Sequence, residues 1–107
     1  MEKEEYRGLL EQLKELGYTE NLDEKSLADP NTLTNIQQWL IKEKGITVAG
    51  LFFFFAEDDS NVSYLIRRNG RIVYTSHKRW SGERREEAFW EGVKEAVKIL
   101  KNNGKAN

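Results

Sequence analysis

The chain has 107 residues, of which 38% are hydrophobic and 33% carry a charge, a composition typical of one small globular domain with a heavily charged surface. It contains no cysteine, so disulfides, thiolate nucleophiles and cysteine-based zinc sites are excluded. No apolar run approaches the ~20 residues of a membrane-spanning helix, and the acidic start Met-Glu-Lys-Glu-Glu-Tyr is unlike a signal peptide. We therefore expect a soluble, cytoplasmic protein.

The formal net charge of −1 conceals an uneven distribution along the chain. Residues 1–29 carry nine acids and four bases, whereas residues 62–85 carry seven bases and one acid. The two segments could neutralise each other within the fold, or the basic segment could contact a partner. A self-compensated surface is the simpler of these two interpretations.

The first predicted element is an amphipathic helix over residues 2–16, followed by Gly17 as a left-handed stop. Its apolar side chains recur at spacings of three and four, as one helical stripe requires; they are Tyr6, Leu9, Leu10, Leu13 and Leu16. Residues 18–28 show no sustained period and are predicted to form a connector with one helical turn around 23–27. Residues 1–28 therefore form an N-terminal unit of helix and connector.

A second helix is predicted to begin at Asp29-Pro30, an N-cap followed by proline at the first helical position. It is expected to end at Gly45, after lysines that favour the helix dipole. Its apolar positions are Leu33, Ile36, Trp39 and Leu40. This helix opens the core domain, residues 29–101.

The strand predicted over residues 46–56 contains four consecutive phenylalanines. Side chains alternate between the two faces of a strand, so Phe52 and Phe54 point to one face, and Phe53 and Phe55 to the other. Both faces are therefore apolar, and helices, a second subunit or a partner must cover each. The N-terminal helix is one candidate for covering the second face.

Residues 57–61 form an acidic turn before two β-rich runs, residues 62–68 and 71–78. Asn69-Gly70 separates these runs, and this dipeptide is the strongest short hairpin signal because both positions tolerate positive φ. The cross-strand pairs expected from a two-residue loop are Arg68–Arg71, Arg67–Ile72, Ile66–Val73, Leu65–Tyr74, Tyr64–Thr75 and Val62–His77.

The last predicted helix covers residues 83–101, with Ser81 as its cap and residues 102–107 as a polar tail. Small residues at Ala88, Gly92 and Ala96 lie four apart and would let this helix sit close to a sheet. The predicted order is thus α-α-β-β-β-α. It indicates an α+β fold in which helices pack on a three-stranded antiparallel meander.

From Thr32 to Leu100 the order α-β-β-β-α resembles that of the double-stranded-RNA-binding domain. The resemblance implies RNA contacts through the first helix, the first strand loop and the start of the last helix. The family's Gly-Pro-x-His loop is here Glu57-Asp58-Asp59-Ser60-Asn61, and its Lys-Lys-x-Ala-Lys is Arg84-Arg85-Glu86-Glu87-Ala88. The added carboxylates would repel phosphate, so the resemblance is to the topology only.

The C-terminal two thirds of the chain also resemble small uncharacterised proteins of gut bacteria and their phages. The motifs that carry this resemblance are Trp39-Leu40, Ile46, Tyr64, Ile66, Asn69-Gly70, Tyr74, Glu86-Glu87-Ala88, Gly92 and Lys94-Glu95-Ala96. It implies a phage- or prophage-related protein and no particular activity.

The residues that could support catalysis are few. His77 is the one histidine, and its neighbour Ser76 points to the opposite face of a strand, so no nucleophile is paired with it. The turn Asp58-Asp59-Ser60-Asn61 lacks the spacing of an EF-hand, and no glycine-rich phosphate loop is present. We therefore expect no enzyme, no metal and no cofactor.

The basic and aromatic segment is the candidate binding surface. Its members, expected around one end of the hairpin and the start of the last helix, are Arg67, Arg68, Arg71, Lys78, Arg79, Trp80, Arg84 and Arg85. The like-charged pair Arg68–Arg71 costs up to ~1 kcal/mol unless an acid or anion lies nearby. The sequence favours a non-enzymatic protein-interaction module, with self-association one option, that uses this surface or the second aromatic face. Nucleic-acid binding through the basic segment is the alternative.

Overall fold

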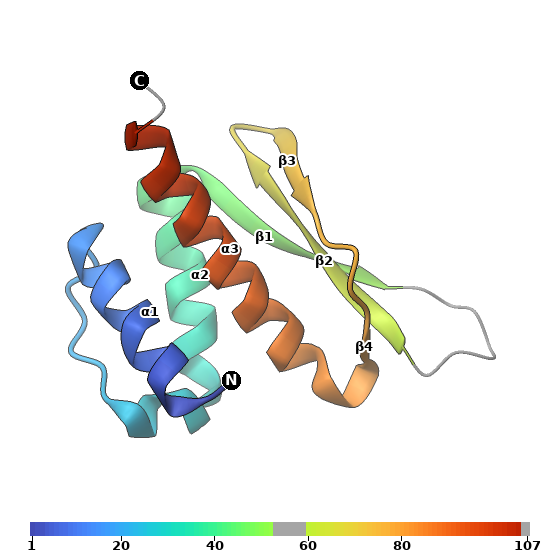
Figure 1. Ribbon diagram of the computed structural model, residues 1–107, viewed down its shortest axis with the longest axis horizontal. Helices are drawn as coiled ribbons and strands as arrows, with labels where there is room; N and C mark the ends of the chain where they lie inside the picture. The colour runs from blue at the N-terminus through green and yellow to red at the C-terminus, as the bar shows by residue number, and fades with distance from the viewer. Residues whose placement is uncertain (53–59, 106–107) are drawn as a thin grey trace.

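The computed structural model describes residues 1–52 and 60–105, which fold into helices packed on an antiparallel sheet (Figure 1). The elements are α1 (Lys3–Glu15), η1 (Glu24–Ala28), α2 (Pro30–Lys44), β1 (Ile46–Phe52), β2 (Ser60–Arg68), β3 (Arg71–Thr75), β4 (Trp80–Ser81), η2 (Gly82–Arg84) and α3 (Arg85–Lys105). The predicted α+β class and the order α-α-β-β-β-α are confirmed.

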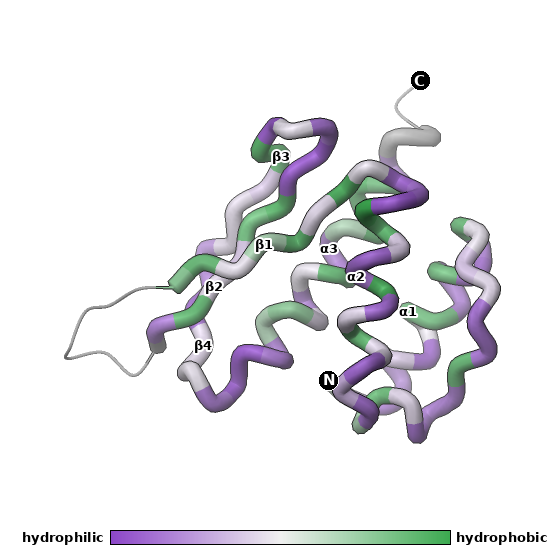
Figure 2. Tube along the Cα trace, turned by 180° about the vertical axis from the view of Figure 1, so that it is seen from behind, coloured by the Kyte–Doolittle hydropathy of each residue, from purple (hydrophilic) through white to green (hydrophobic). Residues whose placement is uncertain are grey.

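The sheet has the order β1-β2-β3, and the two-residue strand β4, which was not predicted, pairs with β2 beyond the end of β3. Helices α2 and α3 pack on one face of this sheet, while α1 contacts α3 and η1 and no strand. The three helices therefore all lie on the same side of the strands (Figures 1 and 2). The expectation that the N-terminal helix could cover the second face is wrong.

The helix ends follow the capping signals of the sequence. After α1, Gly17 has a φ of 106°, and the N–H of Tyr18 reaches back to the carbonyl of Leu13 at 2.9 Å, the hydrogen bond of a Schellman motif. The Asp29 side chain accepts from the Asn31 N–H at 2.9 Å, and Gly45 ends α2 with a φ of 64°. These boundaries confirm the predicted starts and stops within one residue.

The last helix differs from its prediction at both ends. Ser81 stands before the short 3-10 turn η2 and makes no side-chain capping bond, so α3 begins at Arg85. The helix then continues through Asn102 to Lys105, although asparagine and glycine have a weak helix propensity. The polar tail predicted from residue 102 is thus helical as far as residue 105.

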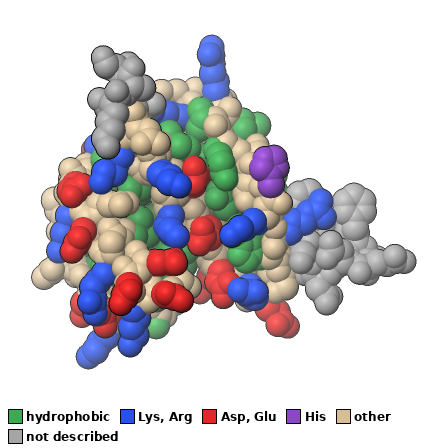
Figure 3. Space-filling view, viewed as in Figure 1, with side chains coloured by type: hydrophobic (Ala, Val, Ile, Leu, Met, Phe, Trp, Pro, Cys, Tyr) green, Lys and Arg blue, Asp and Glu red, His purple; other side chains and the backbone are tan. Residues whose placement is uncertain are grey.

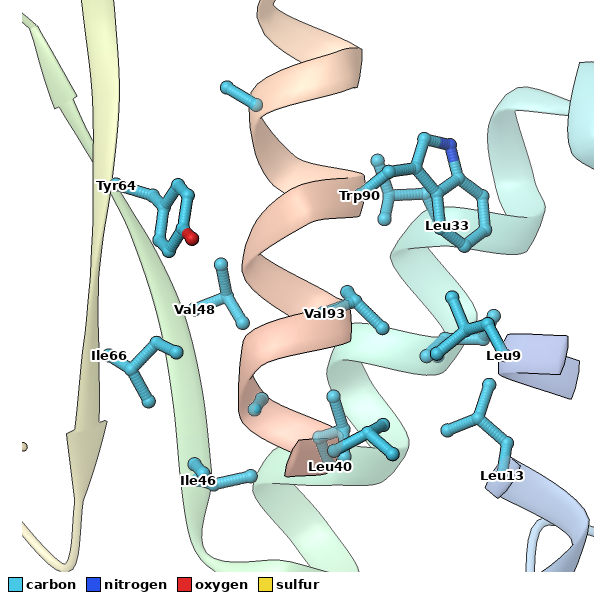
Figure 4. Packing of buried hydrophobic residues seen from close by; sticks show 14 of the residues in the cluster. Leu9, Leu13, Leu33, Leu40, Ile46, Val48, Tyr64, Ile66, Trp90 and Val93 are labelled. Carbon is cyan, nitrogen blue, oxygen red and sulfur yellow. The ribbon is translucent and has the colours of Figure 1, made fainter. Parts of the chain in front are cut away.

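Helix α3 lies between the sheet and the other helices and carries core residues on both sides (Figure 4). On the sheet side, a Cβ built on Gly92 would lie 2.3 Å from Cγ1 of Val48, so the missing side chain is what permits this close approach. On the opposite side, Trp90 packs edge-to-face on Tyr6 of α1 with ring centroids 5.4 Å apart. The ridge of small residues predicted in this helix therefore does face the strands.

The β2–β3 hairpin follows the predicted register at its tip and departs from it further on. Arg68 is opposite Arg71 and Arg67 is opposite Ile72, but Tyr74 is opposite Ile66 because the register shifts by one residue. The extra residue, Val73, forms a β-bulge, which increases local twist and moves the following residues to the other face. The predicted pairs Ile66–Val73, Leu65–Tyr74 and Tyr64–Thr75 are therefore wrong. The pair Val62–His77 is wrong as well, because β3 ends at Thr75 rather than at residue 78 and Val62 pairs with Trp80.

The phenylalanine run is described at its first member only. Phe52 lies at the end of β1 on the helix-covered face and is 55% exposed. The predictions for Phe53, Phe54 and Phe55, and for residues 57–59 of the acidic turn, concern residues outside the described ranges. The last two residues of that predicted turn, Ser60 and Asn61, belong instead to β2.

Candidate interaction surface

The face of the sheet away from the helices, here called the open face, has no helix or strand over it in the described part of the chain (Figure 2). Val48, Tyr64 and Ile66 belong to the core on the helix-covered face. Because successive side chains of a strand point to opposite faces, the residues next to these three lie on the open face. The open-face residues are Thr47, Ala49, Leu51, Ser63, Leu65, Arg67, Ile72 and Thr75.

The open face is not uniformly exposed. Ser63 and Leu65 of the central strand are buried, and the Ser63 hydroxyl donates to the Lys78 carbonyl at 2.7 Å. Ile72 is 57% exposed, while Ala49 and Leu51 are partly exposed. Accessible apolar side chains therefore run along both outer strands of this face.

The outer edge of β1 is a second accessible feature, because β1 pairs with β2 alone among the described strands. The Asn69 N–H donates to the Gly45 carbonyl at 3.1 Å, which places the Gly45 carbonyl on the β2 side. Backbone groups of successive strand residues point to opposite edges. The outward N–H and C=O groups are consequently those of Ile46, Val48, Gly50 and Phe52.

The composition of β1 does nothing to block that edge. Its sequence Ile-Thr-Val-Ala-Gly-Leu-Phe contains no charged residue and no proline, the devices by which natural sheets discourage strand addition. The opposite edge is protected in other ways, since β3 is short, carries the charged residue Arg71 and is bulged at Val73. The sheet is therefore open to pairing on the β1 side.

The predicted basic surface is divided by the structure into two groups. Arg67, Arg68 and Arg71 lie at the hairpin tip, beside the start of β1, whereas Lys78, Arg79, Arg84 and Arg85 adjoin the opposite end of β2, where Trp80 pairs with Val62. The six steps along β2 from Val62 to Arg68 span about 20 Å. The expectation of one continuous surface around the hairpin end is therefore wrong.

Trp80 and Arg84, two members of the predicted surface, are engaged by neighbouring side chains, and Arg68 and Arg79 are not free either. Trp80 is 9% exposed and packs near Tyr64, with ring centroids 5.9 Å apart, so it belongs to the core. Arg84 forms an ion pair with Glu87, and their hydrogen bond raises the pKa of Arg84 and lowers the pKa of Glu87. The acids that follow Arg84 and Arg85 in the sequence thus offset part of this positive charge.

The acidic N-terminal helix makes its ion pairs with α3 and η1. Nζ of Lys94 lies 3.2 Å from a carboxylate oxygen of Glu5, and Nζ of Lys101 lies 3.0 Å from one of Glu15. Arg7 pairs with Glu24 in the connector. Figure 3 shows the resulting mixture of acids and bases over the helices. Because α1 contacts no strand, it is not the element that neutralises the hairpin tip.

His77 lies on a pocket of about 260 Å³ between the β3–β4 connection and α3. The pocket is lined by Tyr64, Tyr74, Ser76, His77, Lys78, Trp80, Glu91 and Glu95. The Ser76 hydroxyl is engaged by Tyr64 and by the Lys78 N–H, the latter at 3.1 Å. Within the described residues His77 makes no hydrogen bond or ion pair, so the pocket contains no serine–histidine pair. Sequence reasoning did not foresee that Glu91 and Glu95 would line the same pocket as this histidine.

Burial raises the pKa of Tyr64 well above its usual value of 10, with further contributions from Tyr74 and Glu95. A phenol whose folded pKa is raised contributes full stability below pH 10 and loses it as pH rises further, because the unfolded state ionises first. We expect this residue to account for roughly 1 kcal/mol of the stability lost between pH 10 and 11. Urea unfolding at pH 9 and pH 11 should therefore show a smaller loss in Tyr64→Phe than in the wild type, and an equal loss would contradict the assignment.

No helix in the described ranges is long and apolar enough to cross a membrane. Within residues 1–52 and 60–105, no three histidine or carboxylate side chains gather as a metal site would require. No protein-family model, curated protein or solved structure matches the chain. The fold and the surface described above are therefore the basis for assigning a function.

Proposed function

We propose that the chain is a non-enzymatic protein-interaction module that binds protein through the open face and the outer edge of β1. The observation that carries the proposal is the placement of all three helices on one side of the sheet. The open face is thereby left with accessible apolar side chains. The edge of β1, a strand without charged residues, is left with four residues whose backbone N–H and C=O groups point outward. Surfaces of this kind bind extended segments or other sheets through main-chain hydrogen bonds and apolar contacts.

Nucleic-acid binding, the alternative, receives less support from the arrangement of the basic residues. A phosphate backbone is best followed by a continuous stripe of cations, whereas here the two basic groups are about 20 Å apart along β2. One of them also includes the Arg84–Glu87 ion pair. Titration with duplex RNA and DNA in ~50 mM salt, where phosphate contacts are strongest, should show no binding.

The proposal predicts that a charge on the open face abolishes binding. Ala49→Lys changes the open face at β1, and Ile72→Lys changes it at β3, where the side chain is 57% exposed. Thr34→Lys is the matched control, since Thr34 is exposed on α2. Each purified protein is immobilised and exposed both to soluble copies of itself and to an extract of cells that encode it, with retained chains identified by mass spectrometry.

The expected result is a polypeptide retained by the wild type and by Thr34→Lys but lost from at least one open-face variant. All variants should keep the wild-type circular dichroism, because both substituted side chains point to solvent. Equal retention by all four proteins, or retention by none, would contradict the proposed function.

A further inference from the structure

We infer that the partner bound at β1 is a second copy of the chain, which pairs with it antiparallel about a two-fold axis at Ala49. The inference rests on the proposed function and names the partner for one part of that surface. The two sheets would then be continuous across the dimer, with both β1 strands at its centre.

One register of this pairing uses every outward position of β1. In an antiparallel ladder, residues that exchange two hydrogen bonds point their N–H and C=O groups at each other. The outward residues of β1 are Ile46, Val48, Gly50 and Phe52. Pairing Ile46 with Phe52 of the second copy, and Val48 with Gly50 of the second copy, uses all four positions of both strands. Ala49 then lies opposite Ala49 of the second copy.

The side chains of β1 suit contact with an identical strand. Like charges directly opposite each other destabilise a sheet, and β1 contains none. Cα atoms at a non-hydrogen-bonded pair are only ~4.5 Å apart, and the position on the axis is occupied by alanine. On the helix-covered face, Phe52 is 55% exposed and would pack across Ile46 of the second copy.

Closure of the assembly favours a dimer over a longer array. A two-fold contact uses the same edge of both molecules, so pairing through β1 removes it from further association. The edges that remain belong to β3 and β4, which are short and include the bulge at Val73. Short, bulged strands add poorly to other strands, so growth stops at two copies.

Disulfide cross-linking tests the register directly, because the native chain has no cysteine. Ala49→Cys places two thiols on the axis at a Cα separation of ~4.5 Å, within the range for a disulfide. Thr47→Cys is the matched control on the same strand and face, since Thr47 would lie opposite Leu51 of the second copy. Under mild oxidation we expect Ala49→Cys to form a covalent dimer at least tenfold faster than Thr47→Cys.

Charge exchange at the axis tests the same contact without oxidation. Sedimentation should give a dimer for the wild type and at least tenfold weaker association for Ala49→Lys alone and for Ala49→Glu alone. An equal mixture of the two variants should recover the dimer, because lysine then meets glutamate across the axis. Recovery also shows that both variants are folded.

Three results would overturn the inference. The first is a wild type that remains monomeric at the highest attainable concentration, and the second is equal cross-linking of Ala49→Cys and Thr47→Cys. The third is a dimer that Ala49→Lys leaves unchanged. In the first case the proposed function still stands if another protein is retained and an open-face charge releases it, so the two failures are distinguishable.

Discussion

Replacing Trp90 with alanine is expected to lower the free energy of unfolding by about 3–5 kcal/mol, the usual loss for truncating a large buried aromatic side chain. Trp90 is 5% exposed and lies between α3 and the Tyr6 ring of α1. Urea denaturation followed by circular dichroism measures the change. A loss below ~1 kcal/mol, the mean effect of point mutations in general, would contradict the packing of α1 on α3.

The matched control for this truncation is Ile41→Ala. Ile41 is 49% exposed on α2, so its removal should change stability by no more than ~0.5 kcal/mol. Domains of this size are stable by only ~5–15 kcal/mol, and Trp90→Ala could therefore leave little folded protein. Trp90→Phe keeps an aromatic ring at the site and should give a measurable intermediate loss.

The second large effect is expected from adding one methyl group at Gly92. The new Cβ would lie 2.3 Å from Val48 Cγ1 and 3.2 Å from the Tyr64 ring, so the helix or the strand must move. Overpacking of this kind costs about 1–3 kcal/mol, although alanine gains up to ~1 kcal/mol over glycine in helix propensity. Gly8→Ala separates the two contributions, because no atom lies within 4 Å of its added Cβ.

The two glycine variants should therefore change stability in opposite directions. Gly8→Ala is expected to raise the free energy of unfolding by up to ~1 kcal/mol. The free energy of unfolding of Gly92→Ala should be about 1–3 kcal/mol lower than that of Gly8→Ala. Adding Val48→Ala to Gly92→Ala should give a non-additive recovery, because it removes the atom that clashes. If both glycine variants are equally stable, α3 does not approach the sheet as closely as described.

The elements of the fold could be predicted because their signals are local. The Asp29-Pro30 start, the Gly17 and Gly45 stops and the Asn69-Gly70 turn each depend on a few adjacent residues, and all four are in place. The spacing of small residues in α3 also predicted correctly which side of the helix approaches the sheet. Such signals require no knowledge of the rest of the chain.

Features that depend on contacts between distant segments were not predictable in the same way. An apolar stripe on α1 shows that the helix packs, but it does not distinguish the back of α3 from the second sheet face. The bulge at Val73 has no distinguishing residue, and it appears where Tyr74 can stack on Tyr64, with centroids 6.0 Å apart. Phe89 is half-buried over Gly50, while its neighbour Trp90 is the buried ring.

The candidate site was predictable in part. The sequence indicated a strand with two apolar faces that both require cover, and in the described residues the helices cover one of them. It grouped eight basic and aromatic residues by nearness in the chain, although a strand of nine residues separates its own ends by about 26 Å. Charge clusters along a β-rich segment therefore say little about clusters in space.

The bulge at Val73 interrupts the alternation of side chains in β3, so that residues before and after it follow different patterns of facing. Ile72 faces away from the helices and Tyr74 faces toward them, although residues two apart in a regular strand point to the same face. Deleting Val73 would restore simple alternation and force either the tip or the body to turn over. The orientation of Ile72 relative to the helices thus depends on a residue that is itself nearly half exposed.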